Sequence, residues 1–244
     1  MYKKKCIVEY DGTDFYGWQR QKHLRTVQGE IETALSKIFK KDIKIVGSGR
    51  TDTGVHAIGQ VFHFTTDRFL ENRSILMGLN SLLPSDIVIK DVTDVDISFH
   101  AQKSAKSKTY LYKIFNNPIR SALYRNRAWW IKDKIDENKL YEYLKFFIGE
   151  KDFSAMCLKK SVPDNPIRKI NFIKVVNNRP FIDIEINANG FLHNMVRNIV
   201  GTAIDLYFQK EEPEKIEEII SSKDRENAGR TAPAHGLYLK EVFY

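Results

Sequence analysis

The chain has 244 residues, 42% of them hydrophobic, which is enough for one sizeable globular domain or two small ones that share a core. It carries 39 Lys and Arg against 31 Asp and Glu, and this formal charge of +8 favours a polyanionic partner, with nucleic acid the leading candidate. No apolar run approaches the roughly 18 residues that span a bilayer, and the basic start lacks the apolar core of a signal peptide. We therefore expect a globular protein of the cytoplasm rather than a membrane or secreted protein.

The cysteines and histidines argue against a metal site. Cys6 and Cys157 lie far apart and form neither a disulfide framework nor a Cys-x-x-Cys half-site. The six histidines show no His-Glu-x-x-His arrangement. We expect the chemistry to be done by ordinary side chains.

Hydrophobic periodicity and turn residues predict the elements of the first hundred residues. A strand at residues 5–10 ends in Asp11-Gly12, and an amphipathic helix follows Thr26, a plausible N-cap. The predicted elements are strands at 5–10, about 43–48, 58–65 and 87–95, and helices at 27–39 and 72–82. The loop at 15–23 mixes aromatic, amide and basic side chains, a composition that suits base stacking and phosphate contact but also the edge of a core.

The rest of the chain continues as a β-rich protein with several helices. The predicted elements are strands at 109–116, 170–176, 181–186 and 236–243, helices at 136–148, from 190 and from 213, and loops at 159–165 and 231–235. If the helix begins at residue 190, His193 and Arg197 lie one turn apart and face an anion or a carboxylate, although surface solvation is the commoner fate of such a pair. Lys103, Lys106 and Lys108 approach the strand of Tyr110 and suit either a phosphate backbone or a solvated face.

The segment Gly49-Arg50-Thr51-Asp52-Thr53-Gly54-Val55-His56-Ala57 is the strongest candidate site. It lies between two predicted strands, and in an extended conformation the Arg50 guanidinium shares one face with the Asp52 carboxylate and favours its ionised form. Asp-x-Gly is also ordinary turn chemistry. Asp-Thr-Gly further matches the catalytic tripeptide of aspartic proteases, which would need a homodimer to complete the pair of carboxylates.

Four motifs in one order separate these interpretations. They are Asp11-Gly12 with Gly17-Trp18-Gln19, the segment at 49–57, Phe191-Leu192-His193-Asn194-Met195-Val196-Arg197, and Ala234-His235-Gly236-Leu237-Tyr238-Leu239. Together they resemble the tRNA pseudouridine synthase A family, collinearly from near residue 7 to residue 243. The charge of +8 and this long match argue against a protease.

The resemblance implies an α+β pseudouridine synthase fold with two similar halves. Their antiparallel or mixed sheets join across a central basic cleft, with helices packed behind. Residues 1–104 would carry the catalytic Asp loop, and residues 105–244 the strand of Tyr110 and the helix of Arg197, in a single structural unit with a shared cleft. The resemblance also implies a homodimer, a tRNA partner, no cofactor, no metal and no membrane.

The resemblance further implies that uridine becomes pseudouridine in the tRNA anticodon stem-loop, at positions 38, 39 and 40, through base flipping and catalysis by Asp52. Addition of Asp52 to the base, addition to C1′ and removal of a C2′ proton to give a glycal all stay open. Arg50, Tyr110 and Arg197 are the expected substrate-binding residues, with Arg197 contacting Asp52. The expected RNA contacts are Trp18, Gln19, Arg20, Lys22, His56, Lys103 and His193.

The chain departs from the family pattern in two places. Gln102 follows His100-Ala101 where the family usually has Arg, and residues 156–160 differ from the usual small, polar loop. A changed target range, including another structured RNA, stays open. So does a non-catalytic RNA-binding or RNA-folding protein on the same scaffold.

Overall fold

The computed structural model describes residues 1–244, which form two compact units of mixed α+β structure. The first unit contains residues 1–106 and 238–244, and the second contains residues 107–237. The halves expected from the sequence meet at residues 104 and 105 and leave the whole C-terminus in the second half. The units differ at that end because the last strand pairs with a strand of the first unit. None of the helices combines the length and the apolarity that crossing a lipid bilayer requires.

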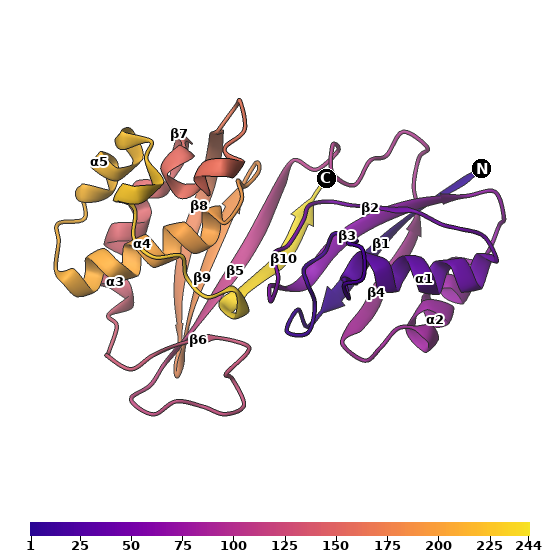
Figure 1. The fold of residues 1–244 in the computed structure, drawn as a ribbon, viewed down its shortest axis with the longest axis horizontal. Helices are drawn as coiled ribbons and strands as arrows, with labels where there is room; N and C mark the ends of the chain where they lie inside the picture. The colour runs from indigo at the N-terminus through magenta and orange to yellow at the C-terminus, as the bar shows by residue number, and fades with distance from the viewer. The chain divides into compact units, whose positions relative to one another are not determined.

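The first unit is a mixed sheet with two helices. Its strands are β1 (Tyr2–Tyr10), β2 (Ile45–Gly47), β3 (His56–Thr66), β4 (Ile87–Asp94) and β10 (Leu237–Phe243), and its helices are α1 (Val27–Phe39) and α2 (Asn72–Leu82). The strands lie in the order β4-β1-β3-β10, with β2 also paired to β3. Only β10 runs parallel to its neighbour β3. Helix α2 packs on α1 and β4 (Figure 1).

Local sequence explains the elements of this unit. Along β1 the side chains alternate, so that Cys6, Val8 and Tyr10 are buried on one face. Helix α1 begins after Thr26, whose hydroxyl accepts the Gly29 N–H at 3.3 Å as an N-cap. The predicted bounds of both helices are confirmed, and the predicted strands are confirmed with ends shifted by up to three residues.

The second unit is a mostly antiparallel sheet with three α-helices. Its elements are β5 (Ser107–Asn116), β6 (Trp129–Ile131), β7 (Gly149–Asp152), β8 (Ile167–Asn178), β9 (Phe181–Ala188), α3 (Glu137–Leu144), α4 (Met195–Gln209) and α5 (Lys215–Ser222). Short 3₁₀ turns lie at Lys145–Phe147, Ser154–Met156, Lys159–Ser161, Arg225–Asn227 and Ala234–Gly236. The strands lie in the order β5-β9-β8-β7, and β6 runs parallel beside β5. Helix α3 packs on α4 and β8 (Figure 1).

The start of α4 corrects the sequence prediction. The helix begins at Met195 rather than near residue 190, because Asn194 adopts the left-handed conformation with φ 62 and interrupts the helical path. Asn is one of the few residues that tolerate this conformation. His193 therefore precedes the helix, and the expected one-turn relation between His193 and Arg197 is wrong.

The segment that carries Gln102 is fixed by a buried histidine. His63 of β3 is 7% exposed, and its Nδ1 accepts the Ala101 N–H at 3.1 Å. Burial lowers the pKa of His63 to about 4, with further lowering by Lys3 and His100. The neutral ring is therefore the form that the fold requires.

Acid should weaken the fold through His63. Between pH 6.5 and pH 4 the unfolded chain binds this proton more strongly than the folded chain, so the free energy of unfolding falls as the pH falls. In His63→Asn a side-chain oxygen keeps an acceptor for Ala101 without a titrating group. From pH 7 to pH 4 the wild type should lose up to about 3 kcal/mol more stability than this variant, measured by urea unfolding. If the free energy of unfolding fell equally with pH in the two proteins, the lowered pKa of His63 would be contradicted.

Candidate active site

Asp52 lies in the loop between β2 and β3, as the sequence predicts. Its turn is closed by a hydrogen bond from the Val55 N–H to the Asp52 carbonyl at 3.1 Å. Gly54 has φ +78 in this turn, a conformation that glycine adopts without steric cost. The Asp52 side chain is half-buried. The sheet thus presents one carboxylate on a short turn.

Two glycines of an earlier loop contact the backbone on either side of Asp52. A Cβ atom at Gly12 would lie 2.0 Å from the Val55 carbonyl oxygen, and one at Gly17 would lie 2.6 Å from the Thr51 carbonyl oxygen. Gly17 also has φ +80. No larger residue fits at either position without a backbone shift, so the two loops meet backbone to backbone.

Thr51, the residue before Asp52, is held by two further contacts. Its hydroxyl lies 2.8 Å from the Tyr10 hydroxyl, and its carbonyl accepts the Trp18 N–H at 3.1 Å. Burial raises the pKa of Tyr10 above its ordinary value, so the phenol keeps its proton for this hydrogen bond. The peptide group that leads into Asp52 is therefore fixed.

Buried polar side chains hold both ends of the loop. At the entrance, the Gln60 amide donates to the Gly49 carbonyl at 3.0 Å. At the exit, His56 Nδ1 accepts the Gly12 N–H at 3.0 Å, and the His56 ring stacks on Tyr238 with centroids 4.6 Å apart. Because Tyr238 lies on β10, a strand from the far end of the sequence supports the loop of Asp52.

Arg50 is exposed and joins a chain of hydrogen bonds that leads into α1. Its Nε donates to Gln19 Oε1 at 3.1 Å, the Gln19 amide donates to Gln28 Oε1 at 2.8 Å, and the Gln28 amide donates to Glu32 Oε1 at 3.0 Å. Glu32 is 2% exposed and also accepts the Ile45 N–H at 3.2 Å. We call Arg50, Gln19, Gln28 and Glu32 the Arg50 network. A buried carboxylate orients the guanidinium through two amides.

The same carboxylate holds a second guanidinium. Arg20 Nη1 donates to Glu32 Oε2 at 2.8 Å, while 54% of the Arg20 side chain stays exposed. Charge-assisted bonds of this length are stronger than neutral ones. Glu32 therefore supports the exposed Arg20 directly and the exposed Arg50 through two amides, and it also pairs with the exposed Lys44 at 3.7 Å. Exposed cations of this kind suit contact with phosphates.

The structure divides the expected RNA contacts of the first unit by exposure. Trp18 and His56 are buried, with 2% and 1% of their surface exposed. The Trp18 ring packs at 6.3 Å from that of Phe62, and both buried rings have core roles in this structure. Gln19 is half-buried, and the exposed side chains are Arg20, Lys22 and Lys103.

Tyr110 of β5 is 8% exposed, and its ring meets the edge of Phe191 at 4.9 Å. Its neighbour on the same strand face, Tyr112, is fully buried and donates its hydroxyl to the Pro233 carbonyl at 2.8 Å. Burial raises the pKa of Tyr112 well above its ordinary value. Tyr112 thus anchors the segment before β10.

Arg197 lies in the first turn of α4 and is fixed at two points. Its Nε donates to the Ala232 carbonyl at 2.8 Å, and its Nη1 donates to Asn194 Oδ1 at 2.9 Å. His193 is exposed, and its Nδ1 lies 3.0 Å from the Ser161 hydroxyl. The structure brings Arg197 together with the loop before β10, and it brings His193 to a different partner. The chain contains no group of three or more His, Cys, Asp or Glu that is arranged to hold a metal ion.

Three residues of the site are missing from the sequence prediction. Gln28 and Glu32 have one local signal, since two polar residues one helical turn apart can pair. Nothing local identifies Gln60, which is completely buried within β3. Its role depends on the path of a loop eleven residues away.

Comparisons with known proteins agree over nearly the whole chain. A family model described as tRNA pseudouridine synthase matches residues 6–102 and 144–244. The chain is 42% identical over 240 residues to tRNA pseudouridine synthase A of Acetivibrio thermocellus, covering 98% of each chain. It is 44% identical over 237 residues to that of Caldicellulosiruptor saccharolyticus, covering 97% of each, and 43% identical over 244 residues to that of Bacillus pumilus, covering 99% of each.

Gly17→Ala should move the loop of Asp52, and Gly149→Ala is its matched control. Gly149 has φ +106 but nothing within 4 Å of a built Cβ, so it isolates the strain of the left-handed conformation, about 1–2 kcal/mol. Gly17→Ala adds a collision with the Thr51 carbonyl oxygen, so the free energy of unfolding should fall by about 3 kcal/mol or more in this variant. Denaturant unfolding measures both losses, and hydrogen exchange of residues 49–55 should rise only in Gly17→Ala. Equal losses of stability in the two variants, with unchanged hydrogen exchange of residues 49–55, would disprove the close contact.

Proposed function

Because this chain belongs to the tRNA pseudouridine synthase family, we propose that Asp52 carries out its chemistry. The enzyme has tRNA pseudouridine synthase activity and is an isomerase. The observation that best supports Asp52 is its place on a turn whose backbone is fixed at Thr51 and Val55. The exposed Arg50 guanidinium lies two residues away in the same loop.

The reaction rearranges one nucleotide without net oxidation or reduction. The N1–C1′ bond of uridine breaks, the uracil rotates, and a C5–C1′ bond forms. The C5 proton leaves to solvent, and N1 takes up a proton. In this proposal the Asp52 carboxylate acts as nucleophile towards the base or C1′, or as base towards the C2′ proton. Every route needs its oxygen within contact distance of the target nucleotide, which a rigid turn favours.

The target base must leave the helical stack before Asp52 reaches it, at a cost of a few kcal/mol. In this proposal the Arg50 guanidinium fills the space of the extruded base or pairs with Asp52. The Arg50 network supports this role, because a side chain that is already oriented loses less conformational entropy when it binds RNA.

Two residues of the second unit complete the proposed uridine site. Tyr110 offers a ring for stacking on the uracil, and Arg197 contacts Asp52. The contacts that hold these side chains support preorganised roles: Phe191 beside Tyr110, and Ala232 with Asn194 around Arg197.

The proposed substrate is the anticodon stem-loop of tRNA, at positions 38, 39 and 40, and the proposed active form is a homodimer. The charge of +8 supports a polyanionic substrate, and Arg20, Lys22 and Lys103 are exposed for phosphate contact. Gln102 is exposed where the family usually has Arg, so its neutral amide makes the target range a property to measure. Three tRNA transcripts, each with uridine at only one of these three positions, would measure the target range.

Loss of the Asp52 carboxylate should abolish turnover while leaving RNA binding. With tRNA transcript labelled by tritium at uridine C5, Asp52→Asn should release label at least about a thousandfold more slowly than the wild type. Asp14→Asn, an exposed aspartate in a neighbouring loop, is the control and should match the wild type. If Asp52→Asn released tritium as fast as the wild type, Asp52 would not be the catalytic carboxylate. Binding without release by the wild type on every tRNA would favour the non-catalytic RNA-binding alternative.

The Arg50 network should matter for turnover more than for affinity. Gln28→Ala removes the amide that orients Gln19, so kcat should fall about tenfold with KM changed less than about threefold. Gln21→Ala removes an amide of the same loop that donates to the Tyr16 carbonyl outside the network, and should leave both constants unchanged. A selective rise in KM in Gln28→Ala would show that the network serves binding alone.

A further inference from the structure

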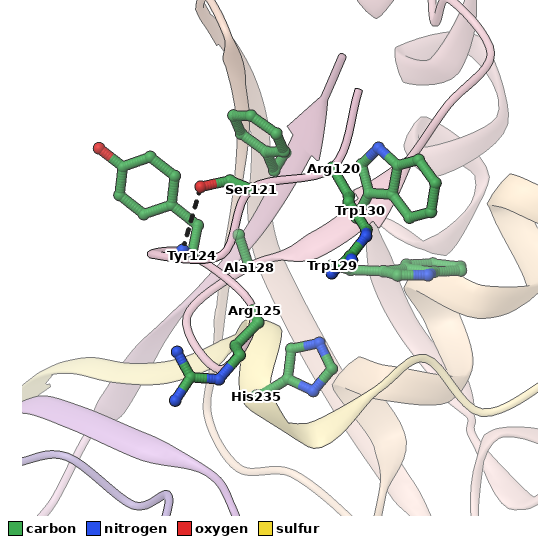
Figure 2. A pocket seen from close by; sticks show the side chains of 9 residues that line it. Arg120, Ser121, Tyr124, Arg125, Ala128, Trp129, Trp130 and His235 are labelled. Atoms are coloured by element: carbon green, nitrogen blue, oxygen red, sulfur yellow. Dashed lines mark hydrogen bonds between the residues drawn. The ribbon is translucent and has the colours of Figure 1, made fainter. Parts of the chain in front are cut away.

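The second unit contains a cavity of about 260 Å³ outside the contacts described above (Figure 2). Four aromatic side chains line it: Phe115, Tyr124, Trp129 and Trp130. The cavity lies mainly on the segment between β5 and β6, within the stretch 103–143 that separates the two matches to the family model.

The rings of this cavity are held in place. Trp130 Nε1 donates to the Asn117 carbonyl at 2.8 Å, and Trp129 meets the ring of Tyr112 at 6.2 Å and 87°. Tyr124 packs edge-on against Phe181 at 4.8 Å. Fixed aromatic walls suit stacking of a planar ligand, because little side-chain entropy remains to be lost.

The loop that carries the cavity is also ordered by its own hydrogen bonds. The Ser121 hydroxyl accepts the N–H groups of Leu123 at 3.2 Å and Tyr124 at 3.3 Å, and the latter bond is drawn in Figure 2. The Tyr124 carbonyl accepts the N–H groups of Arg127 at 3.0 Å and Ala128 at 3.1 Å. These turns fix which side chains face the cavity.

The charge of the segment points to an anionic ligand. Residues 117–134 contain the five cations Arg120, Arg125, Arg127, Lys132 and Lys134 and the single carboxylate Asp133. Arg120 and Arg125 line the cavity and are exposed, and no acidic residue lines it.

His235 adds a polar group without a charge at the cavity wall. Burial lowers its pKa below the ordinary value, with further lowering by Arg197. The imidazole also makes a hydrogen bond with the backbone of Ala128, another residue of the cavity lining.

An RNA nucleotide fits these features better than a second copy of this chain. Ile119 and Leu123 of the loop are 76% and 80% exposed, which alone would suit an apolar partner. A symmetric contact, however, would bring two strongly cationic segments together, whereas phosphates neutralise them. The volume lies just below the usual range for pockets of drug-sized ligands and suits a single base.

We propose that this cavity is a second nucleotide subsite, which takes one unstacked base of the RNA between its aromatic walls and the adjoining phosphates on Arg120 and Arg125. This inference rests on the proposed function in that the ligand is the RNA substrate. The subsite recognises RNA outside the target uridine, so it acts on binding rather than on the chemical step.

Photocrosslinking tests the subsite directly. A full-length tRNA transcript with 4-thiouridine in place of uridine is irradiated with the wild type, and crosslinked peptides are mapped by mass spectrometry. A crosslink within residues 115–130 is expected, and it should persist in Trp130→Phe and be lost in Trp130→Ala. Crosslinks confined to other segments would overturn the proposal.

Binding measurements with the same tRNA separate base from phosphate contacts. Trp130→Ala should raise the dissociation constant for this tRNA about fivefold or more and leave kcat unchanged. Tyr141→Ala, which removes another exposed ring of the same unit, is the control and should leave the dissociation constant unchanged. Arg120→Ala should reduce the slope of log Kd against log salt by about one, whereas Arg73→Ala on α2 should not.

The outcomes also distinguish this subsite from the proposed catalytic function. Unchanged affinities and salt slopes in both cavity variants, with normal tritium release, would overturn the subsite and leave the function intact. A crosslink in residues 115–130 without tritium release by the wild type would support the subsite and contradict the function. A change of oligomeric state in Trp130→Ala with an unchanged salt slope in Arg120→Ala would assign the cavity to a second copy of the chain and overturn the proposal.

Discussion

The close approach of two backbones is the constraint on which the site depends. The loop after β1 meets the loop of Asp52 so tightly that Gly12 and Gly17 leave no room for a Cβ atom. Thr51 completes the contact, since its hydroxyl shares a hydrogen bond with the Tyr10 hydroxyl and its carbonyl accepts the Trp18 N–H. A carboxylate on a free loop would lose its geometry to thermal motion, and here β1 and the loop that follows it oppose that loss.

The strand β10 explains why the end of the chain belongs to this site. Its Tyr238 stacks on His56, and His56 accepts the Gly12 N–H, so the support of Asp52 runs from the last strand to the first loop. The same logic applies to Arg50, whose orientation originates in the buried carboxylate of Glu32. In both cases a buried polar group positions an exposed or half-buried one.

Sequence patterns predict those parts of the structure that depend on neighbours in the chain. The bounds of α1 and α2 follow from apolar periodicity, with the Thr26 cap at the start of α1. The start of α4 does not follow from this periodicity, because Asn194 adopts a left-handed conformation that apolar spacing does not signal. The motifs single out Asp52 and Arg50 as candidate site residues. Composition cannot tell that Trp18 and His56 are buried, nor that Glu32 is buried against the general preference of acids for the surface.

A crystal structure of Asp52→Asn bound to a tRNA transcript tests the central claim most directly. The account predicts an extruded uridine whose ribose C1′ or base lies within about 4 Å of the side chain of residue 52. A uridine that stays stacked in the stem, or an extruded uridine more than about 10 Å from that side chain, would contradict it.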